Sequence, residues 1–199
     1  AYHIGFVLGP CLNASGRLDT AKRAIELLCA KTKRDADILA GDLKALNDSR
    51  KDMTAQAVED AVEMVEHTEL GKDRVLVLYL PECHESLAGI VAGRVREKYY
   101  KPVFVLTEAE DGGKGSGRSI EAYHMYEEMN RCKDLFTKFG GHKLAAGLSL
   151  PETYERKLSI DRGRFVRESV DRYAASAGLC ERNSCGGTGV FRTVRKRES

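Results

Sequence analysis

Residues 74–106 read RVLVLYLPECHESLAGIVAGRVREKYYKPVFVL, and this stretch decides the fold. Its two apolar runs, 74–80 and 103–106, are rich in β-branched residues, which is typical of strands buried on both faces. Between them, Ser86 is predicted to cap a helix that ends before Pro102. A strand, a helix and a second strand within about 30 residues predict a parallel crossover unit.

The predicted helix carries two features that suit a ligand. Gly89 and Gly93 are four residues apart and share one face, so the helix can approach a strand or a substrate backbone closely. Each glycine lowers helix stability by roughly 1 kcal/mol relative to alanine, so two glycines in one helix indicate a role that compensates for this loss. His84 stands just before the helix, where free N–H groups can meet a bound anion.

Two glycine-rich segments follow the second predicted strand, and both are interpreted as phosphate-binding loops. Residues 115–119 read GSGRS, and residues 139–147 read FGGHKLAAG. Successive N–H groups in a glycine-rich turn form a concave anion site. Arg118 would add a bidentate cation to the first loop, and His142 would add a switchable donor to the second. A phosphate of a larger substrate is therefore the expected ligand.

A long helical pattern precedes this unit. No proline interrupts residues 35–67, and apolar residues recur there at helical spacing. An unbroken helix would be about 50 Å long at 1.5 Å per residue, which favours a bridge between two lobes; the alternative is two shorter helices that separate near residues 47–49. With a short helix predicted at 122–130 and a third strand at 145–150, the expected fold is α/β. It has a small, mainly parallel sheet flanked by helices and preceded by a long helical connector.

The beginning of the chain carries a further candidate phosphate contact. A short apolar run ends at Pro10, and a small-residue turn with the sequence NASGR follows at residues 13–17. The guanidinium of Arg17 suits bidentate recognition of an oxyanion; the alternative, which the local sequence favours, is a surface ion pair with Asp19. Because the chain opens with Ala1 beside an apolar run, we expect it to be a fragment of a longer protein.

Composition narrows the class of protein. The 199 residues are 42% hydrophobic and 31% charged, which is typical of a soluble globular protein. The net charge of +2 does not indicate a nucleic-acid binder by itself, so such a role depends on local clustering. No apolar run approaches the roughly 20 residues of a membrane helix. The six cysteines are scattered without a C-x-x-C pair, which disfavours zinc and favours free thiols in a reducing cytoplasm.

Residues 152–199 have a different character from the rest. They hold nine Arg and two Lys against seven acidic residues, a local net charge of +4. One interpretation is a basic arm for nucleic acid, and the favoured one is a poorly structured terminus. A third is a segment that is not native to the fold, such as the product of a shifted reading frame.

Four stretches stand in a fixed order along the chain: LGPCLNASGR at 8–17, CHESLAGIVAGR at 83–94, GSGRS at 115–119 and GGHKLAAG at 140–147. Together they resemble the C-terminal part of the RecJ-type single-strand-specific exonucleases of the DHH phosphoesterase superfamily. The resemblance covers residues 1–151 and implies a two-lobed parent enzyme. An N-terminal lobe with an Asp-His-His motif would bind two manganese or magnesium ions, and the DHH-associated C-terminal lobe would hold single-stranded DNA.

The resemblance also implies roles for particular residues. The first candidates for phosphate contacts are Arg17, Arg118, Gly140, Gly141 and His142, and the next are His84, Ser86 and Arg94. The chain has no Asp-His-His and its five histidines are dispersed, so we expect no catalytic residue and no metal ligand in it. Cys83 stands where the family usually has an aromatic residue, which argues against base stacking there, and Glu85-Ser86 replaces the commoner Gln-Gly pair.

Three segments are expected on this basis. Residues 1–68 would connect to a missing N-terminal catalytic lobe, residues 69–151 would form the DHH-associated substrate-binding domain, and residues 152–199 would be the basic tail. The leading function is the single-stranded-DNA grip of a cytoplasmic 5′-to-3′ exonuclease of DNA repair and recombination, with this chain inactive on its own. The alternatives are a DHH phosphodiesterase for short oligonucleotides or cyclic dinucleotides, a stand-alone nucleic-acid-binding module, and a domain whose glycines serve packing alone.

Overall fold

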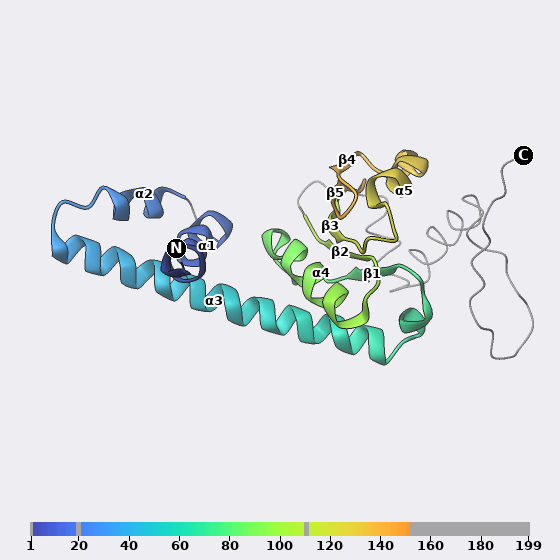
Figure 1. Ribbon diagram of the computed structural model, residues 1–199, viewed down its shortest axis with the longest axis horizontal. Coiled ribbons are helices and arrows are strands. Elements are labelled where there is room, and N and C mark those ends of the chain that lie inside the picture. Colours follow the sequence, from blue (N-terminus) through green and yellow to red (C-terminus); the bar gives the residue numbers. More distant parts are fainter. Residues whose placement is uncertain (1, 19–20, 110–111, 152–199) are drawn as a thin grey trace, which may run out of the picture.

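The computed structural model describes residues 2–18, 21–109 and 112–151. One long helix, α3 (Lys33–Glu66), runs through the molecule. Helices α1 (Gly9–Leu18) and α2 (Lys22–Leu28) lie along its first half, while α4 (Glu85–Tyr99) and a five-stranded sheet lie along its second half (Figure 1). The shorter helical elements are η1 (Ile4–Leu8), η2 (Glu69–Lys72), α5 (Met125–Arg131) and η3 (Lys133–Leu135).

Helix α3 is continuous over 34 residues, so the predicted long helix is confirmed and the alternative of two shorter helices is wrong. Thr32 caps its start by accepting a hydrogen bond from the Asp35 N–H at 3.1 Å. At the expected break, Asp48 pairs with Lys44 at 2.8 Å and with Lys51 at 2.9 Å. These contacts join neighbouring turns and support the helix where Asn, Asp and Ser would otherwise favour an end.

The NASGR segment, residues 13–17, is helical, which corrects the prediction of a turn. Pro10 lies near the start of α1, directly after η1. The preceding apolar run forms η1 and continues directly into α1. Ala14 and Ser15 are buried on α1, which packs against α3, so tertiary contact outweighs the local turn preference of these small residues.

The five strands lie in the order β1-β2-β3-β5-β4. They are β1 (Leu76–Tyr79), β2 (Val103–Thr107), β3 (Lys114–Arg118), β5 (Ala145–Ser149) and β4 (Lys138–Gly141). Among these described strands, β1 and β2 are parallel and joined through α4 as predicted, whereas the other three pairings are antiparallel. The expectation of a mainly parallel sheet is therefore wrong. Short connections link β2 to β3 and β4 to β5, whereas a parallel pair needs a crossover of a dozen or more residues.

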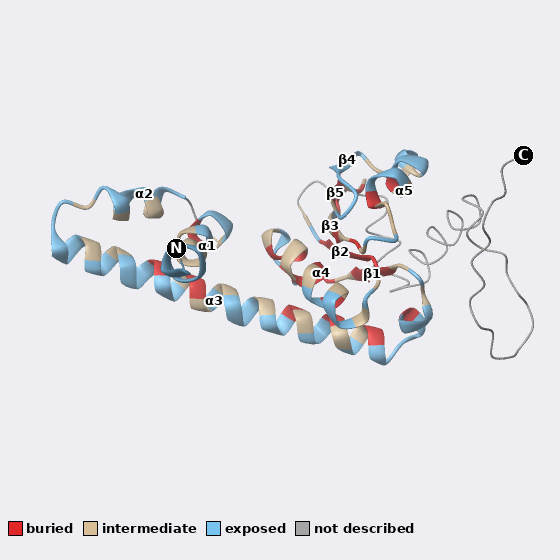
Figure 2. Cartoon of the chain, viewed as in Figure 1, coloured by how far each residue is buried: buried red, intermediate tan, exposed pale blue. Residues whose placement is uncertain are grey.

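Both faces of the sheet carry packed side chains, which confirms an α/β sheet flanked by helices. The face beneath α4 and the end of α3 is lined by Leu76, Leu78, Val103 and Val105. The opposite face, toward α5, is lined by Phe104, Leu106, Met125, Ala146 and Leu148. Buried residues concentrate on the strands and on the sides of α3 and α4 that meet them (Figure 2).

Strands β3 and β4 correct the prediction of two glycine-rich loops, because both segments are extended and paired. A Cβ at Gly115 would lie 2.5 Å from Leu106 Cδ2, and one at Gly117 would lie 2.5 Å from Met125 Sδ. These glycines therefore make room for core side chains that arrive from other elements. No local pattern in the sequence could show this.

Two further expectations concern the C-terminal tail and membrane-spanning helices. The prediction for residues 152–199 lies outside the described residues. Among the helices that are described, none is both long and apolar enough to cross a bilayer.

Candidate nucleic-acid interface

Part of one sheet face is left uncovered, and we call it the open face. Gly115 and Gly117 point into the α5 core, so the alternate residues of β3 point to the side of α4. Helix α4 packs over β2 and β3, and β5 and β4 extend beyond it. The open face consists of Lys114, Ser116 and Arg118 of β3, Ala145, Gly147 and Ser149 of β5, and Lys138 and Gly140 of β4.

The strand register orders the open face into three rows. Lys114 lies beside Ser149, which lies beside Lys138; Ser116 lies beside Gly147, which lies beside Gly140; and Arg118 lies beside Ala145. Gly140 and Gly147 are exposed, and a Cβ at Gly140 would meet no atom within 4 Å. The middle row is therefore a strip almost without side chains, and cations lie in the rows on its two sides: Lys114 and Lys138 on one, Arg118 on the other.

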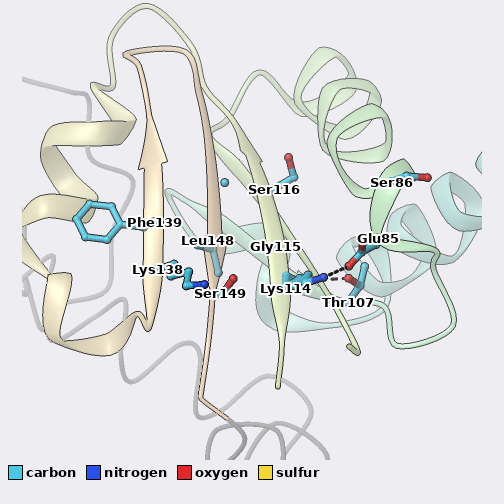
Figure 3. A pocket seen from close by; sticks show the side chains of 11 residues that line it. Glu85, Ser86, Thr107, Lys114, Gly115, Ser116, Lys138, Phe139, Leu148 and Ser149 are labelled. Carbon is cyan, nitrogen blue, oxygen red and sulfur yellow. Dashed lines mark hydrogen bonds and ion pairs between the residues drawn. The ribbon is translucent and has the colours of Figure 1, made fainter. Parts of the chain in front are cut away.

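A hollow of about 370 Å³ lies at the lysine end of the open face (Figure 3). Its lining includes Lys114, Ser116, Lys138 and Ser149 from the strands and Glu85 from the start of α4. The Lys114 Nζ lies 2.6 Å from a carboxylate oxygen of Glu85. The ring of Phe139 points away from the hollow (Figure 3), and Leu148 is the other large apolar residue of its lining.

Arg118 places a partly buried guanidinium at the other end. Its Nη1 donates to the Gly117 carbonyl at 2.7 Å and to Ser116 Oγ at 3.3 Å. Burial lowers the pKa of Arg118, and the positive charges of Arg96 and Arg17 lower it further. Among the described residues, no carboxylate forms an ion pair with this side chain. A partly desolvated guanidinium among like charges is stabilised by an added anion.

Gly89 of α4 gives Arg118 its position. A Cβ at Gly89 would lie 2.6 Å from Arg118 Nη2 and 3.0 Å from Ser116 Oγ. The predicted close approach along this face of the helix therefore occurs at Gly89, and its partner is a side chain of this chain. At Gly93 a Cβ would meet no atom within 4 Å, so close packing does not explain that glycine.

Arg17, His84 and Ser86, which are distant in sequence, meet at the start of α4. Arg17 Nη1 donates to the Ser86 carbonyl at 2.5 Å, and Ser86 Oγ donates to the Arg17 carbonyl at 3.1 Å. The cap of α4 is His84, whose Nδ1 accepts from the Ser86 N–H at 3.3 Å, so the prediction of Ser86 as the cap is wrong. The Arg17 side chain thus binds α4 and links α1 to the sheet domain; Asp19 lies outside the described residues.

The second glycine segment lies in the β4–β5 hairpin. A Cβ at Gly141 would lie 2.6 Å from the Ala146 Cα, so this glycine is required by the close approach of β5. The His142 N–H donates to the Ala145 carbonyl at 2.8 Å, which places exposed His142 at the Arg118 end of the open face. Because Gly140 and Gly141 are paired strand residues, their N–H groups do not converge, and the predicted concave anion trap does not form.

The structure brings most of the predicted residues to one side of the domain. Arg94 is exposed on α4, and among the described residues we find no hydrogen bond or ion pair for it. Sequence reasoning missed Lys138 and Ser149, and it did not select Lys114 as a site residue although it considered the stretch that begins there. The alternation of polar residues with glycine in KGSGR, residues 114–118, is the period-two signal that could have placed Lys114 on the same face of a strand as Arg118.

The metal ions that the resemblance implies find no fitting site here. Within the described parts of the chain, no three His, Cys, Asp or Glu side chains gather into a set that could hold a metal ion. Divalent catalytic metals in nucleases need several carboxylate or imidazole ligands. No chemical step is therefore derived from this chain, and the assignment of the metals to another lobe stays a prediction.

Comparison with known proteins gives consistent matches. The DHHA1 domain matches residues 72–172. The single-stranded-DNA-specific exonuclease RecJ of Escherichia coli is 39% identical over 179 residues, which cover 86% of this chain and 31% of that protein. RecJ of Bacillus subtilis is 36% identical over 149 residues, covering 74% of this chain and 19% of that one. The crystal structure of RecJ from Thermus thermophilus in complex with Mg²⁺ matches with a TM-score of 0.71 and 29% identity, over 87% of this chain and 26% of that chain. The chain thus spans about a third or less of the length of these relatives.

Proposed function

This chain belongs to the DHHA1 domain family, and from that premise we propose that it is the DNA-gripping part of a single-strand-specific exonuclease. The parent enzyme would remove nucleotides in the 5′-to-3′ direction, in the cytoplasm, during DNA repair and recombination. The resemblance to RecJ proteins supports the proposal, since those relatives are named as single-stranded-DNA-specific exonucleases.

The open face is the observation that carries the proposal. Rows that are two residues apart on a strand lie about 6.7 Å apart, so Lys114 and Arg118, four residues apart, lie about 13 Å from each other along β3. A strand that crosses these rows would meet cations at both ends and bare backbone at Gly140 and Gly147. Such a surface suits a phosphate backbone, because it offers charge and close approach without groups that read bases.

Arg118 is the proposed centre of the grip. Its guanidinium is fixed by the Gly117 and Ser116 oxygens and by the space at Gly89, so little side-chain entropy is lost on binding. His142 at the hairpin and Arg17 beside Ser86 are proposed as further phosphate contacts on either side of it. Gly140 and Gly141 contribute by shaping the surface, and Arg94 and His84 add positive charge or donors at the edge of α4.

The domain division is also a proposal. We propose that residues 1–68 connect this domain to a catalytic lobe that binds manganese or magnesium, and that residues 69–151 form the substrate-binding domain. Large apolar side chains of the first segment support a contact with another part of the parent protein, since Ile4 is 69% exposed and Phe6 is 72% exposed. The Thermus RecJ structure is a complex with Mg²⁺, which supports divalent metal use by the parent enzyme.

The test is binding of a fluorescent oligothymidylate to the chain, measured by anisotropy at about 50 and 200 mM salt. Arg118→Ala should weaken binding by about 1.5–3 kcal/mol, or roughly tenfold to a hundredfold, and should make the slope of log K against log salt shallower by about 0.7. His142→Ala should weaken binding less, because that side chain is exposed. The control is Arg131→Ala, on α5 at the opposite face, where the arginine is paired with Glu128. Equal binding by Arg118→Ala and Arg131→Ala would contradict the proposed grip.

A further inference from the structure

An ion pair between Glu85 and Lys114 lies inside the hollow at the lysine end of the open face. Glu85 is the first residue of α4, and Lys114 is the first residue of β3 (Figure 3). Their charged atoms are 2.6 Å apart, and both side chains are close to half exposed. Lys138, on the other side of the hollow, forms no ion pair among the described residues. A ligand would therefore have to compete with Glu85 for Lys114, whereas no described carboxylate competes for Lys138.

A carboxylate is the least expected group in a surface that binds phosphates. The start of a helix carries a partial positive charge, and the start of α4 lies beside Lys114, with Ser116 and Thr107 in the same hollow. That combination would attract a phosphate oxygen. The Glu85 carboxylate already supplies a negative charge there, in contact with the lysine that a phosphate would otherwise meet.

We propose that Glu85 is an internal competitor for the backbone phosphate at this end of the open face. When the hollow is empty, the carboxylate holds Lys114; when a strand enters, a phosphate must displace it. Glu85 thus weakens the grip on single-stranded DNA at the lysine end, while the Arg118 end binds at full strength. This inference rests on the proposed function, because it assigns a role to Glu85 only if the open face binds a nucleic-acid backbone.

The alternative is an ion pair that serves only to hold α4 against β3. Pairs between half-exposed side chains contribute little to folding stability and are screened by salt. Removal of the charge on Glu85 should therefore leave the fold intact. It should also remove the carboxylate that competes with a phosphate for Lys114, whereas a purely structural pair would not change how binding depends on salt.

The experiment compares Glu85→Gln with Glu82→Gln in the 199-residue chain, with the fluorescent oligothymidylate as probe. Glu82 is exposed three residues earlier, so its substitution changes the net charge equally outside the hollow. Glu85→Gln should bind about two- to fivefold more tightly at low salt, and its log K should fall more steeply with log salt by about 0.7. Glu82→Gln should keep the wild-type slope.

A second substitution tests whether Lys114 carries the effect. Lys114→Gln should cancel the gain in the Glu85→Gln background, so that the double variant binds no more tightly than wild type. Identical affinity and slope for Glu85→Gln and Glu82→Gln, with Arg118→Ala still defective, would overturn this inference and leave the proposed function standing. Absence of oligothymidylate binding by every variant would overturn both. Melting curves of all variants verify that each is folded.

Discussion

Replacing Gly89 with alanine should separate the position of the Arg118 guanidinium from the stability of α4. The new methyl group would lie 2.6 Å from Arg118 Nη2, which is closer than real Cβ contacts come, and 3.2 Å from Arg118 Cζ, which is tighter than most of them. The guanidinium is the far end of a flexible side chain, so it moves and the backbone stays in place. Its hydrogen bonds to Ser116 Oγ and to the Gly117 carbonyl would be lost or lengthened.

Gly89→Ala should have two opposing effects on folding stability but only one effect, a loss, on DNA binding. Alanine in place of glycine inside a helix stabilises by about 1 kcal/mol, and the weakened hydrogen bonds of Arg118 cost about 0.5–1.5 kcal/mol each. The net effect is between about 0 and 2 kcal/mol of destabilisation, so the melting temperature should stay near that of wild type or fall by up to about 8 °C. Binding of oligothymidylate should fall by about tenfold, or about 1.4 kcal/mol, because the displaced guanidinium keeps its charge but loses its fixed position.

Gly41→Ala is the matched control. Gly41 is also inside a helix, is exposed on α3, and a Cβ there would meet no atom within 4 Å. This substitution should raise the melting temperature by about 2–4 °C and leave DNA binding unchanged. If Gly89→Ala also raised the melting temperature and bound like wild type, Arg118 would not need its fixed position and the reasoning would be refuted.

Two further predictions concern metal-dependent cleavage and the long helix. The chain supplied with Mn²⁺ should not degrade single-stranded DNA, because its described residues hold no set of metal ligands; release of nucleotides by the purified chain, measured by gel or chromatography, would contradict this. The hydrogen bonds of Lys44 and Lys51 lower the pKa of Asp48 from 3.8 to about 2, so their stabilisation of α3 is present above about pH 4 and is lost as the pH falls through about 2. Asp48→Asn should therefore lower the melting temperature slightly near neutral pH and match wild type below pH 2, and a constant difference across that range would show that Asp48 acts in another way.

The elements that the sequence predicted well are those whose signals are local. The apolar runs before Pro81 and before Glu108 became β1 and β2, and the proline-free stretch from residue 35 became α3. Each is specified by a run of residues that satisfies one periodicity over several turns or along a whole strand. The class of fold followed from these three elements and from the helix between the strands.

The predictions that failed depended on contacts from elsewhere in the chain. Strand β3 is two-fifths glycine, and its strand character comes from pairing with β2 and β5. Its glycines are required because Leu106 and Met125 fill the space that their side chains would take. Likewise, the helical form of residues 13–17 depends on burial against α3. In both cases tertiary packing overrode a local preference for turns.

The glycines of the candidate site therefore act in three distinct ways, although the sequence presents them alike. Gly115, Gly117 and Gly141 are small because neighbouring atoms leave no room for a Cβ. At Gly89 the Arg118 guanidinium occupies the space of a Cβ, so this glycine bears on the proposed phosphate contact only through that side chain. Gly140 alone among these five has open space around it on the open face, and packing gives no reason for its size. A substitution that adds one methyl group at Gly140 would thus test contact with the DNA backbone itself, since only a bound strand can make that methyl group unfavourable.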